Sequence, residues 1–183
     1  MPNNNAPALF DISAIIRKMK ITEGQSVAEL GCGNFGFFVW PLARLVGRRG
    51  RVYAVDVLKG HLDEIKRVAL KDNLPQVKTI WSNLEVFQGT QIESSSLDAA
   101  LLINILYQSE KKAEILREAM RLLKRNGQLM IVEWGNSDSP LGPRPEKRVK
   151  LESLKSAAAK LGLELQREFI AGPYHYGIIL TKI

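Results

Sequence analysis

The sequence predicts an α/β fold, a three-layer sandwich in which helices cover both faces of a seven-stranded, mainly parallel sheet. Apolar, strand-like runs alternate with amphipathic helical segments along most of the 183 residues, which is typical of a parallel sheet. The last two strand-like runs are separated only by Gly172 and Pro173, so they predict an antiparallel hairpin that reverses the last strand. We expect a single domain over residues 1–183.

The individual elements follow from apolar spacing and from glycine and proline punctuation. Apolar residues recur at helical spacing between Leu9 and Met19, which predicts a cap helix over residues 9–20, and we expect residues 1–8 to be disordered. Pro41 is expected to kink or restart the helix that contains it. We expect strands at 26–30, 50–57, 77–83, 97–106, 127–134, 163–171 and 174–183, helices at 35–47, 59–73, 110–127 and 151–162, and a long loop at 135–150.

Composition narrows the class of protein. No apolar run is long enough to span a membrane, and the N-terminus lacks the pattern of a signal peptide, so we expect a cytoplasmic protein. Cys32 is the one cysteine, which excludes an intramolecular disulfide and a multi-cysteine metal site, and we expect no metal. The net charge of +7 comes from basic clusters at 43–51, 117–125 and 142–150, which either attract RNA or anionic substrates or form solvated surfaces.

Three glycines mark the exit of the first expected strand. Gly31, Gly33 and Gly36 have the spacing G-x-G-x-x-G, which allows a sharp strand-to-helix turn and lets a ligand lie against the backbone. Asp56 ends the second strand 23 residues after Gly33, where an acid can accept hydrogen bonds from ribose hydroxyls. The pattern predicts an adenosine-type cofactor.

Glu29 helps to choose among adenosine cofactors. It lies two residues before the first glycine, where a carboxylate would repel a pyrophosphate but would suit a ligand with a cationic amine and a sulfonium. The terminal hairpin points the same way, because nicotinamide-binding domains usually keep their last strand parallel. Both features disfavour a nicotinamide oxidoreductase.

These motifs resemble those of the class I S-adenosylmethionine-dependent methyltransferases, over residues 9–183. The resemblance implies a Rossmann-like sandwich, S-adenosylmethionine as cofactor and S-adenosylhomocysteine as product. "VAELGCGNFG" matches the first motif of the family and "VYAVDV" the second, and "LLKRNGQLMIVEW" is similar to its last helix and fifth strand. Arg125 and Asn126 stand where the family has proline and glycine.

The resemblance also implies a set of cofactor-binding residues. These are Glu29, Gly31 and Gly33 in the first motif, Asp56 and Val57 in the second, Asn83 and Leu84 near the adenine, and Asn104 beside the methionyl group. Each polar residue also has an alternative, structural interpretation. Glu29 would pair with a lysine, and Asp56 would cap a helix. Asn83 would cap a turn, and Asn104 would satisfy nearby backbone groups.

The candidate catalytic residues come from the same rim of the sheet. Glu133 ends the fifth strand and His175 begins the last strand beside it, so the two would form an acid–base pair, although a histidine near a hairpin is also a common structural residue. Tyr107 follows the fourth strand and is expected to face the pocket.

The function expected from the resemblance is in-line methyl transfer to a small-molecule or lipid-like acceptor, with the quinone-biosynthesis enzymes as the nearest analogy. Arg144, Lys147, Arg148 and Lys150 in the loop 135–150 are expected to recognise an anionic group on the acceptor or to steer RNA. Two alternatives remain open: an RNA methyltransferase, and a methyltransferase-like protein that binds a cofactor or partner without catalysis.

Overall fold

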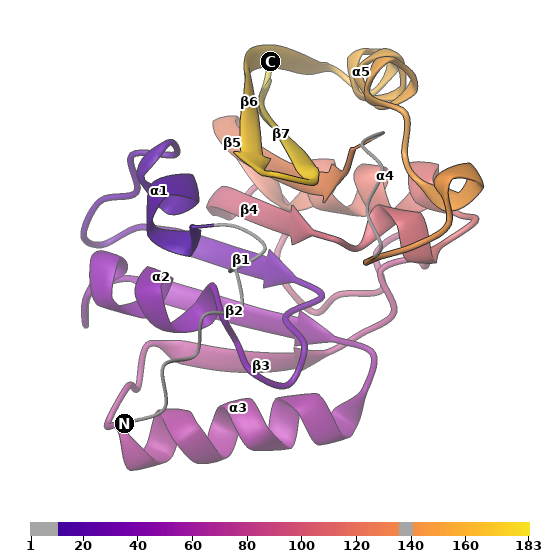
Figure 1. Cartoon of the computed structure of the whole chain (residues 1–183). Coiled ribbons are helices and arrows are strands. Elements are labelled where there is room, and N and C mark those ends of the chain that lie inside the picture. The colour runs from indigo at the N-terminus through magenta and orange to yellow at the C-terminus, as the bar shows by residue number, and fades with distance from the viewer. Residues whose placement is uncertain (1–10, 136–140) are drawn as a thin grey trace.

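One seven-stranded sheet forms the centre of the computed structural model, which describes residues 11–135 and 141–183 (Figure 1). The strand order is β3-β2-β1-β4-β5-β7-β6. The strands are β1 (Ser26–Leu30), β2 (Arg51–Asp56), β3 (Val77–Trp81), β4 (Leu97–Ile103), β5 (Leu123–Trp134), β6 (Leu163–Gly172) and β7 (His175–Lys182). β1 to β5 pair in parallel, and β7 runs antiparallel to β5 and β6. The predicted fold class is confirmed.

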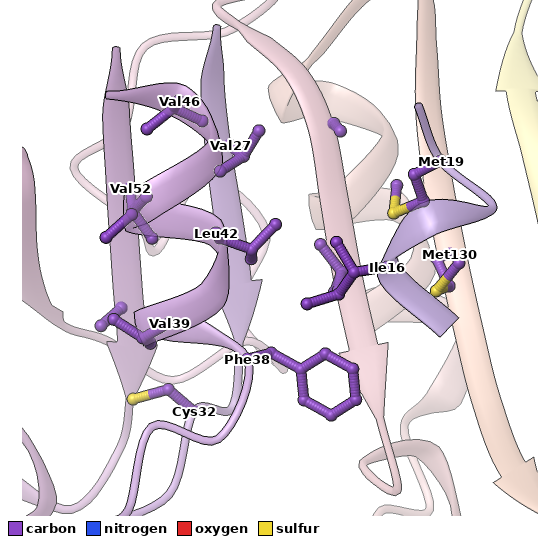
Figure 2. Close-up of a cluster of buried hydrophobic side chains, with 14 of the residues drawn as sticks. Ile16, Met19, Val27, Cys32, Phe38, Val39, Leu42, Val46, Val52 and Met130 are labelled. Carbon is purple, nitrogen blue, oxygen red and sulfur yellow. The ribbon is translucent and has the colours of Figure 1, made fainter. Parts of the chain in front are cut away.

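Helices cover both faces of this sheet. The helices are α1 (Ile12–Arg17), α2 (Val39–Val46), α3 (Lys59–Lys71), α4 (Lys112–Leu122) and α5 (Leu151–Lys160), with short 3-10 turns η1 (Leu106–Gln108) and η2 (Pro145–Lys147). The first three pack on one face and α4 and α5 on the other, so two apolar cores enclose the sheet. Figure 2 shows part of the first core, where Leu42 of α2 and Ile16 of α1 meet side chains of the strands.

The order of the strands places a ligand site. The chain moves outward from β1 to β3 and then returns to the other side of β1 with β4, so the strand order reverses between β1 and β4. In open parallel sheets, ligands bind at the carboxyl ends of the strands where this reversal occurs. The glycine-rich segment after β1 lies at that point.

Several predicted boundaries are wrong for local reasons. The helix predicted from residue 35 begins only at Val39, because Gly36 has a positive φ of 57°. Pro41 does not kink it, since it lies in the first turn, where no intrahelical acceptor is available for an N–H. The strand predicted to reach residue 106 ends at Ile103, because Asn104 adopts a φ of 57°.

Two of the predicted helices also have different boundaries in the structure. The helix predicted over 110–127 ends at Leu122, because Leu123 is extended and pairs with the buried Leu97 of β4. The N-terminal helix spans Ile12–Arg17 and is capped by the side chain of Asp11, which accepts a hydrogen bond from the N–H of Ala14. The predictions for residues 1–8 and for Leu9 lie outside the described residues. Among the described helices, none combines the length and apolar character that crossing a membrane requires.

Candidate cofactor-binding site

A cavity of about 580 Å³ lies at the carboxyl ends of β1, β2 and β4. All eight residues that the motifs predict for a cofactor line it: Glu29, Gly31, Gly33, Asp56, Val57, Asn83, Leu84 and Asn104. Tyr107, one of the predicted catalytic residues, lines it as well. The predicted residues that the fold brings together here lie up to 78 positions apart in the sequence (Glu29 to Tyr107).

A larger groove of about 740 Å³ runs along β3 and α3 at the edge of the sheet. None of the predicted site residues lines it, and none of its described lining side chains carries a buried polar atom without a hydrogen-bond partner. The chemistry therefore favours the smaller cavity as the functional site.

The glycine-rich segment needs its glycines for two different reasons. Gly31 has a φ of 87°, and a Cβ at this position would collide with the side chain of Ile105. Gly33 has a φ of 61°, but a Cβ there would meet nothing within 4 Å. Gly31 thus allows close packing within the protein, whereas Gly33 leaves open space from which a ligand can approach the backbone.

Asp56 ties the glycine-rich segment to the end of β2. Its Oδ2 accepts a hydrogen bond of 2.9 Å from the N–H of Gly33, and its Oδ1 accepts one of 2.9 Å from the N–H of Leu58. The Nδ1 atom of His61 lies 3.3 Å from the same Oδ1. These bonds do not cap α3, because its N-cap residue is Leu58 and has no side-chain cap hydrogen bond among the described residues, so the helix-cap alternative for Asp56 is not supported. Because each carboxylate oxygen can accept more than one hydrogen bond, the side chain can still receive ribose hydroxyls.

Glu29 belongs to β1, and its buried carboxylate lies at the start of α2. It accepts hydrogen bonds from the backbone N–H groups of Phe38 and Val39, and its Oε2 has no hydrogen-bond partner in the part of the chain that is described. Burial raises the pKa of Glu29 well above its usual value, with a smaller contribution from the charge of Asp56. No lysine forms an ion pair with it among the described residues, so the structural alternative for Glu29 is not supported.

Three more polar atoms at the cavity are buried without a hydrogen-bond partner among residues 11–135 and 141–183. They are His61 Nδ1, Ser82 Oγ and Asn104 Oδ1. Asn83, in contrast, uses its Oδ1 to accept a hydrogen bond of 2.9 Å from the N–H of Glu85, so its turn-capping role is present. Buried polar atoms are rarely left unpaired, so this concentration fits a polar ligand such as S-adenosylmethionine. Ser82 and His61 were not predicted, although both adjoin predicted residues.

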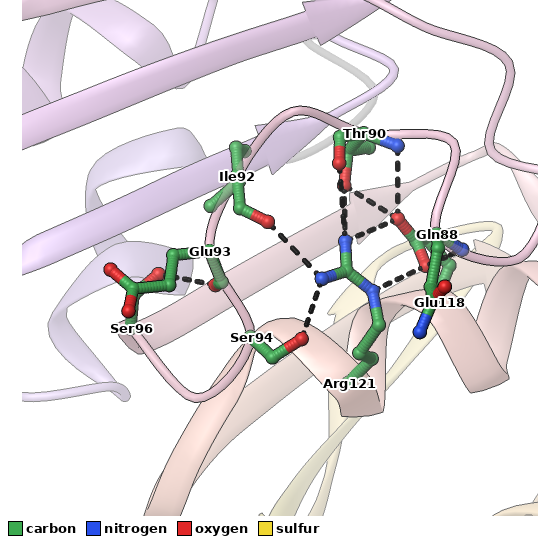
Figure 3. A network of polar contacts seen from close by, with 8 residues as sticks. All are labelled: Gln88, Thr90, Ile92, Glu93, Ser94, Ser96, Glu118 and Arg121. Carbon is green, nitrogen blue, oxygen red and sulfur yellow. Dashed lines mark hydrogen bonds and ion pairs between the residues drawn. The ribbon is translucent and has the colours of Figure 1, made fainter.

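A buried ion pair fixes the loop between β3 and β4, which carries Asn83. Glu118 of α4 is fully buried and accepts hydrogen bonds from the N–H groups of Gln88 and Thr90, while Arg121 bonds both to Glu118 and to the carbonyl of Ile92 (Figure 3). Burial raises the pKa of Glu118, but the hydrogen bonds from Arg121 and the loop outweigh it and lower the pKa to about 2.

The predicted acid–base pair is not formed. In the β5–β7 ladder, Glu133 stands opposite Tyr176 and Trp134 stands opposite His175. Side chains alternate between the faces of a strand, so Glu133 and His175 project from opposite faces of the sheet. The His175 ring packs against Trp134 with the centroids 4.2 Å apart, and burial lowers the pKa of its imidazole to about 4. Neither residue lines the cavity.

The loop after β5 is also different from the expectation. Arg148 is buried, and its guanidinium donates to the carbonyl oxygens of Gly135 (2.8 Å) and Pro143 (3.1 Å), so it fastens the loop. Arg144, Lys147 and Lys150 are exposed. At most three of the four cations proposed for an anionic acceptor are therefore available to it.

Comparisons with known proteins agree with this geometry. A family model described as a methyltransferase domain matches residues 21–171. An S-adenosyl-L-methionine-dependent Diels-Alderase of Talaromyces variabilis is 27% identical over 133 residues, which cover 68% of this chain and 44% of that protein. A demethylmenaquinone methyltransferase of Lactococcus lactis is 26% identical over 130 residues, covering 69% and 48%. The matches thus span less than half of these two relatives.

The fold is shared with solved structures. The crystal structure of an S-adenosylmethionine-dependent methyltransferase from Aquifex aeolicus has a TM-score of 0.86 to this chain at 23% identity, covering 96% of this chain and 91% of that one. At this identity the likeness shows the fold, and the family model carries the assignment. Because that model covers most of the 183 residues, the chain belongs to the class I S-adenosylmethionine-dependent methyltransferase family, as its motifs predicted.

Proposed function

We propose that this protein transfers a methyl group from S-adenosylmethionine to a small-molecule or lipid-like acceptor. The observation that carries the proposal is the cavity at the carboxyl ends of β1, β2 and β4, which is lined by the open backbone of Gly33 and by Glu29 and Asn104. Within the described part of the chain, Glu29 Oε2 and Asn104 Oδ1 have no hydrogen-bond partner. When bound, S-adenosylmethionine supplies a methyl group that is already activated on a sulfonium.

The residues of the cavity would hold the cofactor as follows. The Glu29 carboxylate attracts the cationic amine, and the open backbone at Gly33 lets the ligand approach closely. Asp56 accepts hydrogen bonds from the ribose hydroxyls, and Val57 and Leu84 form apolar walls for the adenine, with Asn83 near its amine. Asn104 then faces the methionyl group, which can bond to the amide oxygen that has no partner among the described residues.

The acceptor side of the cavity is apolar. Phe37, Ile105 and Tyr107 line it, and Phe37 stacks on Phe35 with ring centroids 5.3 Å apart. These two phenylalanines are 60% and 63% exposed, which leaves an aromatic surface at the mouth that suits an apolar acceptor. The relative named for demethylmenaquinone supports a small-molecule acceptor as well.

Methyl transfer from a sulfonium requires little acid or base catalysis. In-line displacement from a sulfonium needs alignment and exclusion of water, and a base only if the acceptor arrives protonated. We therefore keep Tyr107 as the residue that faces the acceptor, and we assign His175, which packs on Trp134, a structural role.

RNA is a weaker candidate than a small molecule, because several of the basic residues are engaged within the protein. Arg117 pairs with Glu114, Arg121 with Glu118 and Lys124 with Asp98, and Arg148 is buried.

A second candidate function is suggested by one relative, which is named as an S-adenosyl-L-methionine-dependent Diels-Alderase. A protein of that kind would need the same cavity but would transfer no methyl group.

A transfer assay separates these functions. The purified protein is incubated with S-adenosylmethionine carrying a radiolabelled methyl group and with three acceptor panels: phenols and quinols, short isoprenoids, and total RNA. The proposal expects label in a small-molecule product and formation of S-adenosylhomocysteine. Label in RNA would establish the alternative substrate, and tight cofactor binding with no transfer to any panel would favour the Diels-Alderase type.

A further inference from the structure

We propose that Glu133 is a positioning residue for the cofactor cavity: its ionised carboxylate holds the turn of residues 104–108 in the shape that S-adenosylhomocysteine requires, and protonation loosens that turn. The inference rests on the proposed function, because it concerns the same cavity. It replaces the predicted role of Glu133 in an acid–base pair.

The turn of residues 104–108 is fastened to β5 at two successive residues. The N–H of Asn104 donates to the carbonyl of Val132 over 2.8 Å, and the N–H of Leu106 donates to Oε1 of Glu133 over 2.6 Å. Asn104 has a positive φ of 57°, so the chain leaves the β4 direction abruptly here. The Glu133 carboxylate therefore supports a sharp bend that regular strand pairing does not hold.

The same turn forms one wall of the cavity. Asn104, Ile105, Tyr107 and Gln108 all line it. Ile105 packs so closely on Gly31 that a Cβ at Gly31 would collide with it. A shift of the turn would therefore change both the width of the cavity and its contact with the glycine-rich segment.

No cationic side chain neutralises the Glu133 carboxylate among the described residues. It is fully buried, and its Oε2 has no hydrogen-bond partner among them. The titratable groups that face it are Tyr107 of η1 and Tyr176 of β7, and the Tyr176 hydroxyl donates instead to the carbonyl of Val149. The nearby loop contributes Arg148, whose guanidinium holds the carbonyls of Gly135 and Pro143.

Backbone N–H groups of the turn are thus the main stabilisers of the charge. Burial raises the pKa of Glu133 to about 7, and hydrogen bonds from the backbone of Leu106, Tyr107 and Ile105 oppose that increase. Linkage makes this effect reciprocal: while the carboxylate stays buried, its ionisation favours the hydrogen-bonded turn over a turn that lacks these bonds, although burial makes ionisation unfavourable for the folded protein as a whole. Protonation near neutral pH would weaken these charge-assisted hydrogen bonds.

The test is calorimetric titration with S-adenosylhomocysteine at pH 6 and pH 8, on the wild type, Glu133→Gln and Glu114→Gln. The glutamine can still accept the Leu106 N–H but carries no charge at either pH. Glu114 lies on α4 and pairs with Arg117, so its variant removes the same charge away from the cavity. Glu29, Asp56 and the other titratable groups of the cavity are unchanged, so their effects cancel in the comparison.

We expect the wild type and Glu114→Gln to bind about threefold to tenfold more tightly at pH 8 than at pH 6, in line with the gain from a charged over a neutral hydrogen bond. The change in affinity between pH 6 and pH 8 should be smaller in Glu133→Gln than in the wild type by about this factor. The same pH dependence in Glu133→Gln as in the wild type would overturn the positioning role.

Amide hydrogen exchange of the wild type tests the turn itself, and does not depend on folding of the variant. After correction for the intrinsic pH dependence of exchange, the Leu106 amide should be better protected at pH 8 than at pH 6 relative to the amides of β4 and β5, which report the change in global stability. Equal relative protection at the two pH values would contradict the proposal. Absence of S-adenosylhomocysteine binding to the wild type at both pH values would contradict the proposed function instead, and the exchange result would still decide the role of Glu133.

Discussion

The N–H of Gly33 donates a 2.9 Å hydrogen bond to Oδ2 of Asp56, which joins the glycine-rich segment after β1 to the end of β2. The sequence motifs predict that Gly33 belongs to the loop beside the cofactor and that Asp56 accepts hydrogen bonds from the ribose. In the folded chain, the acid shapes the loop and also lines the cavity. A single side chain thus shapes the glycine-rich segment and contributes to the wall of the cavity.

Asp56→Ala is expected to weaken binding of S-adenosylhomocysteine by about 10-fold to 100-fold. The variant removes the acceptor of the Gly33 and Leu58 N–H groups, and it also removes the proposed ribose contact. The loss of one hydrogen bond between ligand and charged group, about 1.5–3 kcal/mol, corresponds to this change in affinity. Calorimetric titration measures the affinity. Asp63→Ala is the matched control, because Asp63 is exposed on α3, and equal losses in the two variants would contradict a specific role for Asp56.

Gly33→Ala is expected to reduce cofactor affinity far more than it reduces stability. Gly24 provides the control, since both glycines have a positive φ (61° and 86°) and neither would bring a Cβ within 4 Å of another atom. Each alanine should therefore cost about 1–2 kcal/mol of backbone strain. Thermal unfolding and titration with S-adenosylhomocysteine should show similar destabilisation, but loss of affinity in Gly33→Ala alone. An unchanged affinity there would mean that no ligand lies against Gly33.

Glu118→Gln is expected to destabilise the protein at pH 7 and to have little effect near pH 2. The pKa of Glu118 is lowered to about 2 in the folded protein, so its ionisation stabilises the fold above the unfolded-state value and this contribution disappears as the pH falls through about 2. The loss at pH 7 should be on the order of 2–3 kcal/mol, given about 1.4 kcal/mol per pKa unit. Urea unfolding at several pH values measures it, with Glu114→Gln on the same helix as the control. A difference that persists unchanged at pH 2 would refute this explanation.

Glu133→Gln is expected to make the free energy of unfolding less sensitive to a rise in pH from 5 to 8. Because the pKa of Glu133 is raised to about 7, its contribution is present at acidic pH and is lost as the pH rises from the unfolded-state value through 7. The wild type should therefore lose on the order of 2–3 kcal/mol between pH 5 and pH 8 that Glu133→Gln keeps. The same urea titrations, at pH 5 and pH 8, decide this, and parallel pH profiles for the two proteins would be inconsistent with a buried, uncompensated carboxylate.

The place of the predicted cofactor residues in one cavity could be anticipated because each belongs to a motif at the end of a strand. Glycine spacing after β1, an acid at the end of β2 and "WSNLE" after β3 each place residues at the carboxyl end of a strand, and parallel strands bring those ends to one edge. Val57 and Asn104 were placed by the resemblance to the methyltransferase family. Ser82 was missed because a serine beside a more distinctive asparagine gives no separate signal.

The predictions that failed depended on which face of the sheet a side chain occupies and on how distant segments pair. Glu133 and His175 do reach the same rim, but which face each side chain takes depends on the β5–β7 register, and a shift of one residue reverses it. The burial of Arg148 could not be predicted either, since an arginine in a proline-rich loop is usually exposed, and only the fold brings the Gly135 and Pro143 carbonyls around it. The end of α4 depended similarly on a long-range pair, Leu123 with Leu97.

The central claim is that the cavity beside Gly33 and Asp56 binds the methyl donor. Calorimetric titration of the wild-type protein with S-adenosylhomocysteine, and separately with NADH, tests it most directly. We expect saturable binding of one S-adenosylhomocysteine per chain with micromolar affinity, and no binding of NADH. Binding of NADH without S-adenosylhomocysteine, or binding of neither ligand, would contradict the account.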